Sequence, residues 1–338
     1  MAKKGLSRYL SRREFARKSL IAVAGIGTIS LAGYGVYNKK KLRSLNNILR
    51  MGHCAPSVMQ TLTELNDINN SNLVLYAGAM AGGIAGSDME CGALTAPLMF
   101  MSSQMTDSVP IEEKLGMINK SQAYYNEFTR YNNTNICRII QGNGMSSCIK
   151  AVCGIHQLYS TAITGSGEMP EEKKESFSLL LGEFDKNAFH CAQSVLKNLG
   201  GKVTLTKEFL NASWIFAGGI AMMNRTCGAL AGGVMALSAA TAKMENDYSR
   251  VARMNWLLMH NRTEEAMNEE MNNFNRSIRL SAELGSWFRS EFGSTSCYGI
   301  WGYNFAKTKD SEGFITGNCL KHCKNITDGV AMKIRSMI

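Results

Sequence analysis

Ten cysteines divide into two sets of five along this 338-residue chain, and the residues around them repeat as well. The phrase H-C-A-P-S-V, beginning at His53, returns 137 residues later as H-C-A-Q-S-V, beginning at His190. Self-similarity over such a distance indicates two copies of one structural unit. The sequence therefore predicts a tandem repeat in which each copy gathers thiols that lie far apart in the chain.

The spacing of apolar residues predicts helices. Apolar residues recur at helical intervals after Cys54 and Cys191, and the second cysteines, Cys91 and Cys227, each open a further apolar run. Polar stretches with helical spacing cover residues 111–131 and 262–292. Only four prolines occur in the 338 residues. The expected fold is all-α, with two tandem homologous helical domains related by a pseudo-twofold axis.

Two residues just ahead of the second cysteines, Asp88 and Thr226, are expected to cap the helices that follow. A thiol in the first turn of a helix lies beside unpaired backbone N–H groups and the positive end of the helix dipole. Both favour the thiolate, which is the form that binds metals and attacks electrophiles. We therefore expect the thiols of Cys91 and Cys227 to ionise readily.

The remaining cysteines complete the two sets. The third members are Cys137 and Cys297, and the closing pairs are Cys148 with Cys153 and Cys319 with Cys323. With the run Cys227-Gly228-Ala229-Leu230-Ala231-Gly232, this pattern resembles the family of redox-active proteins named for its C_GCAxxG_C_C motif. The resemblance spans nearly all of residues 50–335 as two copies. It implies a helical fold and a redox role. The first copy departs from the motif at Ala96-Pro97, where the later glycine is missing and the proline would disturb the helix unless it lies in the first turn or at a kink.

The resemblance assigns four cysteines to each copy. They are Cys54, Cys91, Cys137 and Cys153 in the first copy and Cys191, Cys227, Cys297 and Cys323 in the second. Four further residues are secondary candidates: Cys148, Cys319, His53 and His190. The histidines precede the first cysteines, and adjacent helical positions point about 100° apart. We therefore expect the histidines to be supporting or surface residues rather than metal ligands.

Four thiols per copy on apolar helix faces suit the binding of an iron–sulfur cluster, whose type the sequence does not assign. The eight cysteines would be the ligands of this cofactor and its metal. Two alternatives remain open at this point: a disulfide-stabilised binding or scaffold protein of the cell envelope, and a zinc or copper site. The widely spread cysteines differ from the short C-x-x-C loops of zinc ribbons. No catalytic triad, phosphate loop or paired-carboxylate motif stands out, so the sequence assigns no enzymatic reaction.

The first 45 residues contain eleven of the 37 basic residues and one of the 27 acidic residues, which leaves 26 of each in the rest of the chain. A body without surplus positive charge gives no reason to expect a nucleic-acid partner. The run Ser11-Arg12-Arg13-Glu14-Phe15, followed by an apolar segment over residues 20–37, resembles a twin-arginine export signal. We therefore expect export to the periplasm or cell envelope, with an uncleaved membrane anchor left open.

These observations give three expected segments: a signal or anchor over residues 1–45 and two cysteine-motif domains over residues 46–164 and 175–338. A glycine-containing break near residues 164–174 marks the expected linker. The expected work is electron transfer, or support of a membrane oxidoreductase or transporter. The expected partner is a redox protein or a membrane oxidoreductase.

Overall fold

The computed structural model describes residues 37–338, apart from residues 70, 87, 106–108, 143, 245–246 and 261. Residues 41–338 form one compact unit. The described residues are helical, with isolated β-bridges and no strand, and this confirms the all-α prediction. Among them, no helix is long and apolar enough to cross a membrane. The twin-arginine segment and nearly all of the apolar run that follows it lie outside the described residues.

Helices of the first repeat are α2 (Tyr37–Met51), α3 (Cys54–Leu65), α4 (Ser71–Ala77), the short 3-10 helix η1 (Gly78–Met80), α5 (Gly92–Ser103), α6 (Ile111–Asn132), α7 (Cys137–Gly142) and α8 (Met145–Gly165). Those of the second repeat are α9 (Glu171–Lys186), α10 (Cys191–Asn198), α11 (Lys207–Trp214), α12 (Gly228–Thr241), α13 (Tyr248–Met259), α14 (Thr263–Ala266), α15 (Asn275–Phe292), α16 (Cys297–Trp301), α17 (Thr308–Thr316) and α18 (Cys319–Arg335).

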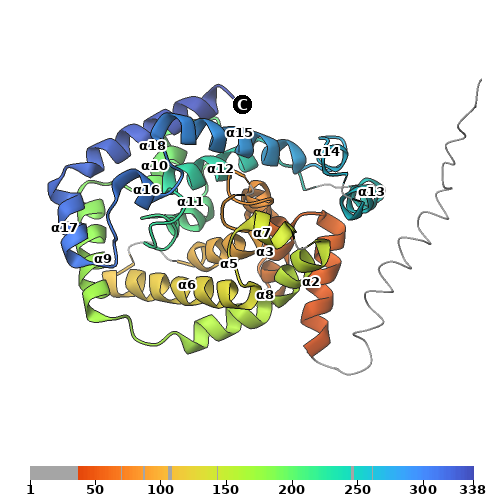
Figure 1. The fold of residues 1–338 in the computed structure, drawn as a ribbon, viewed down its shortest axis with the longest axis horizontal. Helices are drawn as coiled ribbons and strands as arrows, with labels where there is room; N and C mark the ends of the chain where they lie inside the picture. The colour runs from red at the N-terminus through yellow and green to blue at the C-terminus, as the bar shows by residue number, and fades with distance from the viewer. Residues whose placement is uncertain are drawn as a thin grey trace, which may run out of the picture. The chain divides into compact units, whose positions relative to one another are not determined.

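The order of elements repeats (Figure 1). Helices α3 to α8 correspond to α10, α11, α12, α15, α16 and α18, and α13, α14 and α17 are insertions in the second repeat. The same isolated antiparallel bridge recurs in both repeats, between Glu90 and Ile136 and between Thr226 and Ser296. Because each bridge joins the residues just before the second and third cysteines, the repeat extends to local backbone geometry.

The two repeats share one hydrophobic core, with α5 packed on α11 and α4 packed on α12. Hydrogen bonds cross this boundary inside the core: Ser102 Oγ donates to the Ala212 carbonyl at 3.1 Å, and Ser238 Oγ accepts from the Ala79 N–H at 2.9 Å. The central helices α5 and α12 are apolar all round, as expected for helices enclosed on every side. The repeats are therefore held together by packing as well as by the connecting chain.

Pro97 lies inside α5 without ending it. Proline has no N–H to donate to the carbonyl four residues back, which is that of Ala93. The buried hydroxyl of Tyr124, on α6, donates to the Ala93 oxygen at 3.2 Å instead. Helix α5 therefore continues through Pro97, and a neighbouring helix supplies the donor that the Ala93 carbonyl would otherwise lack.

Removing that donor should be costly. We expect Tyr124→Phe to lower the free energy of unfolding by about 1–3 kcal/mol, since a buried carbonyl loses its partner. In a Pro97→Ala background the restored N–H can pair with Ala93, so the same change should cost much less. Urea unfolding of the four proteins measures both costs. Equal costs in the two backgrounds would contradict this account.

The helix expected over residues 262–292 is interrupted. The chain forms the short helix α14 and then turns. The long helix α15 begins only at Asn275. Asparagine side chains bond to the local backbone in the break: Asn268 Oδ1 accepts from the Glu270 N–H and Asn272 Oδ1 from the Phe274 N–H. Such bonds compete with the helical ladder, so the continuous-helix prediction was wrong here.

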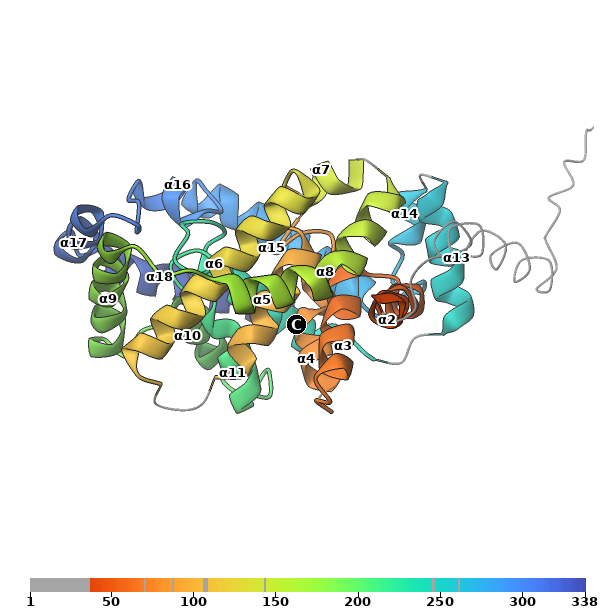
Figure 2. The same ribbon diagram turned by 90° about the horizontal axis from the view of Figure 1, so that it is seen from below.

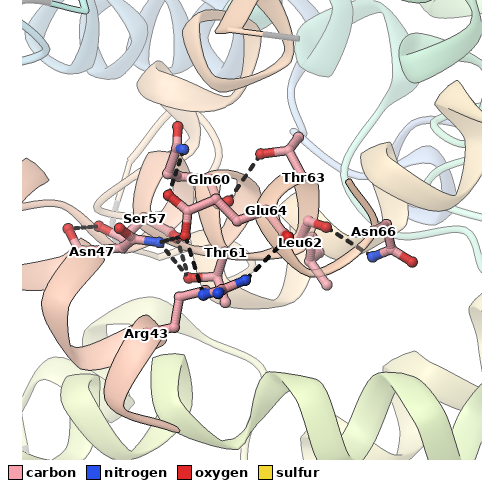
Figure 3. Close-up of polar contacts among 9 residues, drawn as sticks. All are labelled: Arg43, Asn47, Ser57, Gln60, Thr61, Leu62, Thr63, Glu64 and Asn66. Atoms are coloured by element: carbon pink, nitrogen blue, oxygen red, sulfur yellow. Dashed lines mark hydrogen bonds and ion pairs between the residues drawn. The ribbon is translucent and has the colours of Figure 1, made fainter. Parts of the chain in front are cut away.

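Helix α2 is fixed on α3 by a polar network (Figure 3). Asn47 Nδ2 donates to Thr61 Oγ1 and to Glu64 Oε2, each at 3.1 Å, and Arg43 pairs with Glu64. The basic residue Arg43 therefore belongs to the folded body. The expected segment boundary at residue 45 falls inside α2.

Candidate functional site

The isolated bridges bring the second and third cysteines of each repeat together. In the first repeat, the Cys91 N–H donates to the Asn135 carbonyl at 2.8 Å and the Cys137 N–H to the Met89 carbonyl at 2.9 Å. In the second repeat, Cys227 and Cys297 make the same two bonds at 2.8 and 2.9 Å, to the Thr295 and Arg225 carbonyls. Two cysteines separated by 46 or 70 residues thus become backbone neighbours in both repeats.

In each repeat, the glycine after the second cysteine lets the first cysteine pack closely against it. A Cβ at Gly92 would lie 3.0 Å from Cys54 Sγ and 2.6 Å from the Met80 carbonyl. A Cβ at Gly228 would lie 2.9 Å from Cys191 Cβ and 2.4 Å from the Phe216 carbonyl. The glycine that follows each second cysteine therefore has a packing role, because only a residue without a side chain lets the two cysteine-bearing segments approach so closely.

Four cysteines of the first repeat line one cavity of about 360 Å³, and they are Cys54, Cys91, Cys137 and Cys148. Cys153, which the resemblance assigns to this set, is not among the lining residues. Cys148 and Cys153 are five residues apart on α8, so they point about 140° apart around the helix. Cys148, a secondary candidate from the sequence, is therefore the fourth cysteine of the first cluster. Cys153 lies near Lys41 instead.

The second cluster consists of Cys191, Cys227, Cys297 and Cys323, which all lie within electrostatic reach of one another. This is the set that the sequence predicts. Cys191, Cys227 and Cys297 are each 5–6% exposed. The indole of Trp301, on α16, makes a hydrogen bond to Cys323. Cys319, one turn earlier on α18, approaches Cys323 but not the other three sulfurs.

The first cluster favours protonated thiols. Cys54 is hydrogen-bonded to Cys91, and Cys91 to Cys137, so three sulfurs form a chain. The hydrogen bond to Cys91, and then burial, raises the pKa of Cys54 well above its usual value. The hydrogen bond to Cys137 raises the pKa of Cys91. Burial, helped by the nearby Cys54, raises the pKa of Cys148 to about 12.

The second cluster contains one thiol that favours ionisation. The hydrogen bond from Cys297 lowers the pKa of Cys227, and backbone N–H groups at the start of α12 lower it further. The same hydrogen bond, with burial, raises the pKa of Cys297. Burial raises the pKa of Cys191 to about 12. The expected lowering of the thiol pKa therefore applies to Cys227, where the hydrogen bond from Cys297 is the main cause, but not to Cys91, whose hydrogen bond to Cys137 raises its pKa.

The expected helix caps are not made. Asp88 forms an ion pair with Arg138 at 3.1 Å, and Thr226 donates its hydroxyl to the Glu90 carboxylate. Cys91 and Cys227 themselves occupy the capping positions of α5 and α12. Glu90 is 4% exposed and Thr226 3%, and each directly precedes the second cysteine of its repeat. The sequence did not single out Glu90. Glu90 and Thr226 occupy equivalent positions in the two repeats, and the repeats contact each other through this pair.

His53 and His190 stand just before α3 and α10, at equivalent positions. His190 Nδ1 accepts from the Gln193 N–H at 3.3 Å, and its Nε2 bonds to the Trp214 carbonyl at 2.9 Å. His53 Nε2 lies 2.7 Å from Asn275 Oδ1. Burial lowers the pKa of both histidines to about 4. Both ring nitrogens of His190 are thus engaged by the protein.

The histidines make the fold sensitive to acid. Because their pKa is lower in the folded state, the unfolded chain takes up protons first as the pH falls below about 6.5, and stability drops toward pH 4. At pH 5, His190 alone should cost about 2 kcal/mol. His190→Asn keeps an oxygen that can accept from the Gln193 N–H and removes the titration. Urea unfolding at pH 7 and pH 5 should show a smaller loss in the variant. An equal loss would refute this role.

All ten cysteines are free thiols. In the part of the chain that the structure describes, no group of three or more His, Cys, Asp or Glu side chains is arranged to hold a single metal ion. The structure thus contains neither a disulfide framework nor a preformed site for one ion among these residues. The structure contains two clusters of four thiols each, and apolar residues surround both.

Comparison with known sequences supports the repeat. The chain matches the family described as "Putative redox-active protein (C_GCAxxG_C_C)" over residues 52–163 and again over residues 189–337. No curated protein and no solved structure matches it. The two matched regions cover most of the chain, and each contains one cysteine cluster. This protein therefore belongs to the C_GCAxxG_C_C family of redox-active proteins, and it contains two copies of the family's sequence unit.

Proposed function

We propose that each repeat binds one iron–sulfur cluster and that the protein transfers electrons. The observation that carries the proposal is the convergence, in each repeat, of four thiols from separate parts of the chain on one apolar site. Iron–sulfur clusters are held by about four cysteine thiolates, and a closed apolar setting tunes their potential. Membership of a redox-active family agrees with this assignment.

The donor sets suit a cluster better than a single ion. A zinc ion needs four ligands within about 2.3 Å of one point. The described residues offer no such point. In a cluster the thiolates bind different iron atoms, so they can surround a larger body. The hydrogen bond to Cys91 and burial raise the pKa of Cys54, and burial raises the pKa of Cys323, so a bound cation would help to hold both groups as thiolates.

The residues that would hold the clusters are Cys54, Cys91, Cys137 and Cys148 in the first repeat and Cys191, Cys227, Cys297 and Cys323 in the second. A bound cluster supplies reversible one-electron chemistry. The protein contributes burial, which limits access of water to the sulfurs. It also contributes hydrogen bonds to sulfur, such as those from the start of α12 to Cys227 and from Trp301 to Cys323.

Anaerobic purification tests the proposal. The full chain is expected to be brown and to contain iron and acid-labile sulfide in similar amounts, and reduction should bleach the colour. A colourless preparation that contains zinc would favour a zinc protein. A colourless preparation without metal would overturn the assignment.

A second candidate function rests on the sulfurs that touch. Cys54 with Cys91, and Cys227 with Cys297, are hydrogen-bonded pairs of free thiols. Each pair could form a disulfide by exchange with an external disulfide: one thiolate attacks it and releases one thiol, and the second cysteine then displaces the other thiol. Cys227, with its lowered pKa, would be the attacking thiolate. Reversible loss of two thiols per repeat without bound iron would favour this function.

We further propose export by the twin-arginine route and work in the cell envelope. The paired Arg12 and Arg13 and the apolar segment after them support this. A protein whose thiols are ligated before export would avoid oxidation outside the cytoplasm. The proposed partner is a redox protein or a membrane oxidoreductase or transporter. Fractionation of cells that express Arg12→Lys with Arg13→Lys should show the protein retained in the cytoplasm.

A further inference from the structure

The cavity beside the first-repeat thiols has walls from both repeats. From the second repeat, Leu258, Thr263, Met267 and Ile278 line it. Leu258 lies on α13, Thr263 on α14 and Met267 just after α14, and these helices are an insertion without a counterpart in the first repeat. Figures 1 and 2 show α13 and α14 beside α2. The extra segment of one repeat thus covers the thiol site of the other.

This cover, defined as residues 248–260 and 262–272, has a hydrophobic cluster of its own. Met254, Leu257 and Ala266 pack together apart from the main core, with Trp256, Leu258 and Met271 partly buried against them. Segments with small separate cores open at lower free energy than the global core does. The cover is therefore suited to move as one unit.

The cover contacts the first repeat at the end of α2 and at the junction of α2 and α3, just ahead of Cys54, where Arg50 also lies over the Tyr248 ring. Asn272 Nδ2 donates to the Met51 carbonyl at 2.7 Å. Asn275, at the start of α15, ties the base of the cover to this junction: its Nδ2 donates to the Ala266 and Asn268 carbonyls, and its Oδ1 lies 2.7 Å from His53 Nε2. Met254 packs on Gly52 so closely that a Cβ there would lie 2.2 Å from the Met254 Cε.

The cavity offers little to a charged molecule. Its lining includes Ile48, Ile140 and Met145 from the first repeat together with the apolar side chains of the cover. Arg138 is paired with Asp88 at 3.1 Å, and His53 is bonded to Asn275. Placing an unpaired charge in such a setting is unfavourable.

We propose that this cavity receives a small uncharged reactant beside the first-repeat thiols, and that the cover formed by residues 248–260 and 262–272 controls how readily it enters. The proposal deepens the proposed function and rests on it, because it takes the centre held by these thiols as the group that the reactant meets. The second cluster, which lies away from this insertion, then serves as the enclosed electron partner.

Thiol alkylation tests the cover. Gly52→Ala should push Met254 away and loosen the cover. The full chain is alkylated with uncharged iodoacetamide, as purified and again after a chelator has removed any metal. Modification of Cys54 and Cys148 is compared by peptide mass spectrometry with that of Cys191 and Cys323. We expect about tenfold faster alkylation at the first two, which corresponds to about 1.4 kcal/mol, and no change at the others.

Gly293→Ala is the matched control. Gly293 has φ of +75° against +73° at Gly52, but nothing lies within 4 Å of its Cβ position, so only the backbone strain is shared. This control should leave the four rates unchanged. If Gly52→Ala does not fold, Asn272→Ala, which removes the hydrogen bond to the Met51 carbonyl, should give the same selective acceleration.

A second probe tests the preference for uncharged molecules. Anionic iodoacetate should alkylate Cys54 and Cys148 about tenfold more slowly than iodoacetamide, after each rate is corrected for reaction with free glutathione. Equal corrected rates would overturn the selectivity. If the variant accelerated alkylation equally in both repeats, or in neither, the proposed role of the cover would be contradicted. These readouts do not use iron, so a protein without clusters would refute the proposed function and leave this result standing.

Discussion

Cys148→Ser is expected to remove the iron of the first repeat while the second repeat keeps its cluster. Cys148 lines the same cavity as Cys54, Cys91 and Cys137, and serine replaces a soft sulfur ligand with a poor oxygen ligand. Cys153→Ser is the matched control, because this cysteine is on the same helix but does not line the cavity. Iron and sulfide analysis of the two purified variants measures the difference.

The outcome discriminates between two ligand sets. The family order assigns Cys153 to the first repeat, whereas the geometry assigns Cys148. Loss of iron in Cys153→Ser with full retention in Cys148→Ser would show that the cavity is not the binding site. Cys227→Ser is the corresponding change in the second repeat and should remove only the iron of that repeat. Unchanged iron content in Cys227→Ser would count against the second site.

Gly228→Ala is expected to lower the free energy of unfolding by about 3 kcal/mol. The added Cβ would lie 2.4 Å from the Phe216 carbonyl and 2.9 Å from Cys191 Cβ. The carbonyl belongs to the backbone and cannot rotate aside, so the start of α12 must shift away from α10. The same shift would separate Cys191 from Cys227 and weaken the second cluster.

The control for this change is Gly182→Ala in α9. Gly182 is exposed, and nothing lies within 4 Å of its Cβ position. Alanine should therefore stabilise this helix by about 0.5–1 kcal/mol through its higher helix propensity. Thermal and urea unfolding measure both variants. A Gly228→Ala protein as stable as the parent would refute the close approach of α10 and α12.

The repeat and the helices could be predicted because they depend on local pattern. Apolar spacing after Cys54 and Cys191 is enough to predict α3 and α10, and the second cysteines open α5 and α12 as expected. The asparagines near Asn268 and Asn272 were overlooked as helix breakers, although their side chains compete for backbone N–H groups.

The composition of the first cluster could not be predicted from spacing. In the first repeat α8 follows α7 directly, whereas in the second repeat α17 lies between α16 and α18. The number of residues between the third and fourth cysteines therefore does not fix which face of the last helix meets the site. Tyr124 and Glu90 were missed for a similar reason. Their roles depend on partners that only the fold brings near, at Ala93 and Thr226.

The contact between Glu90 and Thr226 bears on how such a chain can evolve. At a true twofold axis each residue meets its own copy, so a homodimer of first repeats would bury two carboxylates against each other. A homodimer of second repeats would pair two hydroxyls and lose the acceptor. A carboxylate that faces a hydroxyl at this position requires two repeats of different sequence. Joining the two repeats in one polypeptide guarantees that they are made in equal numbers. Gene fusion thus preserves an asymmetry that free association of identical subunits would lose.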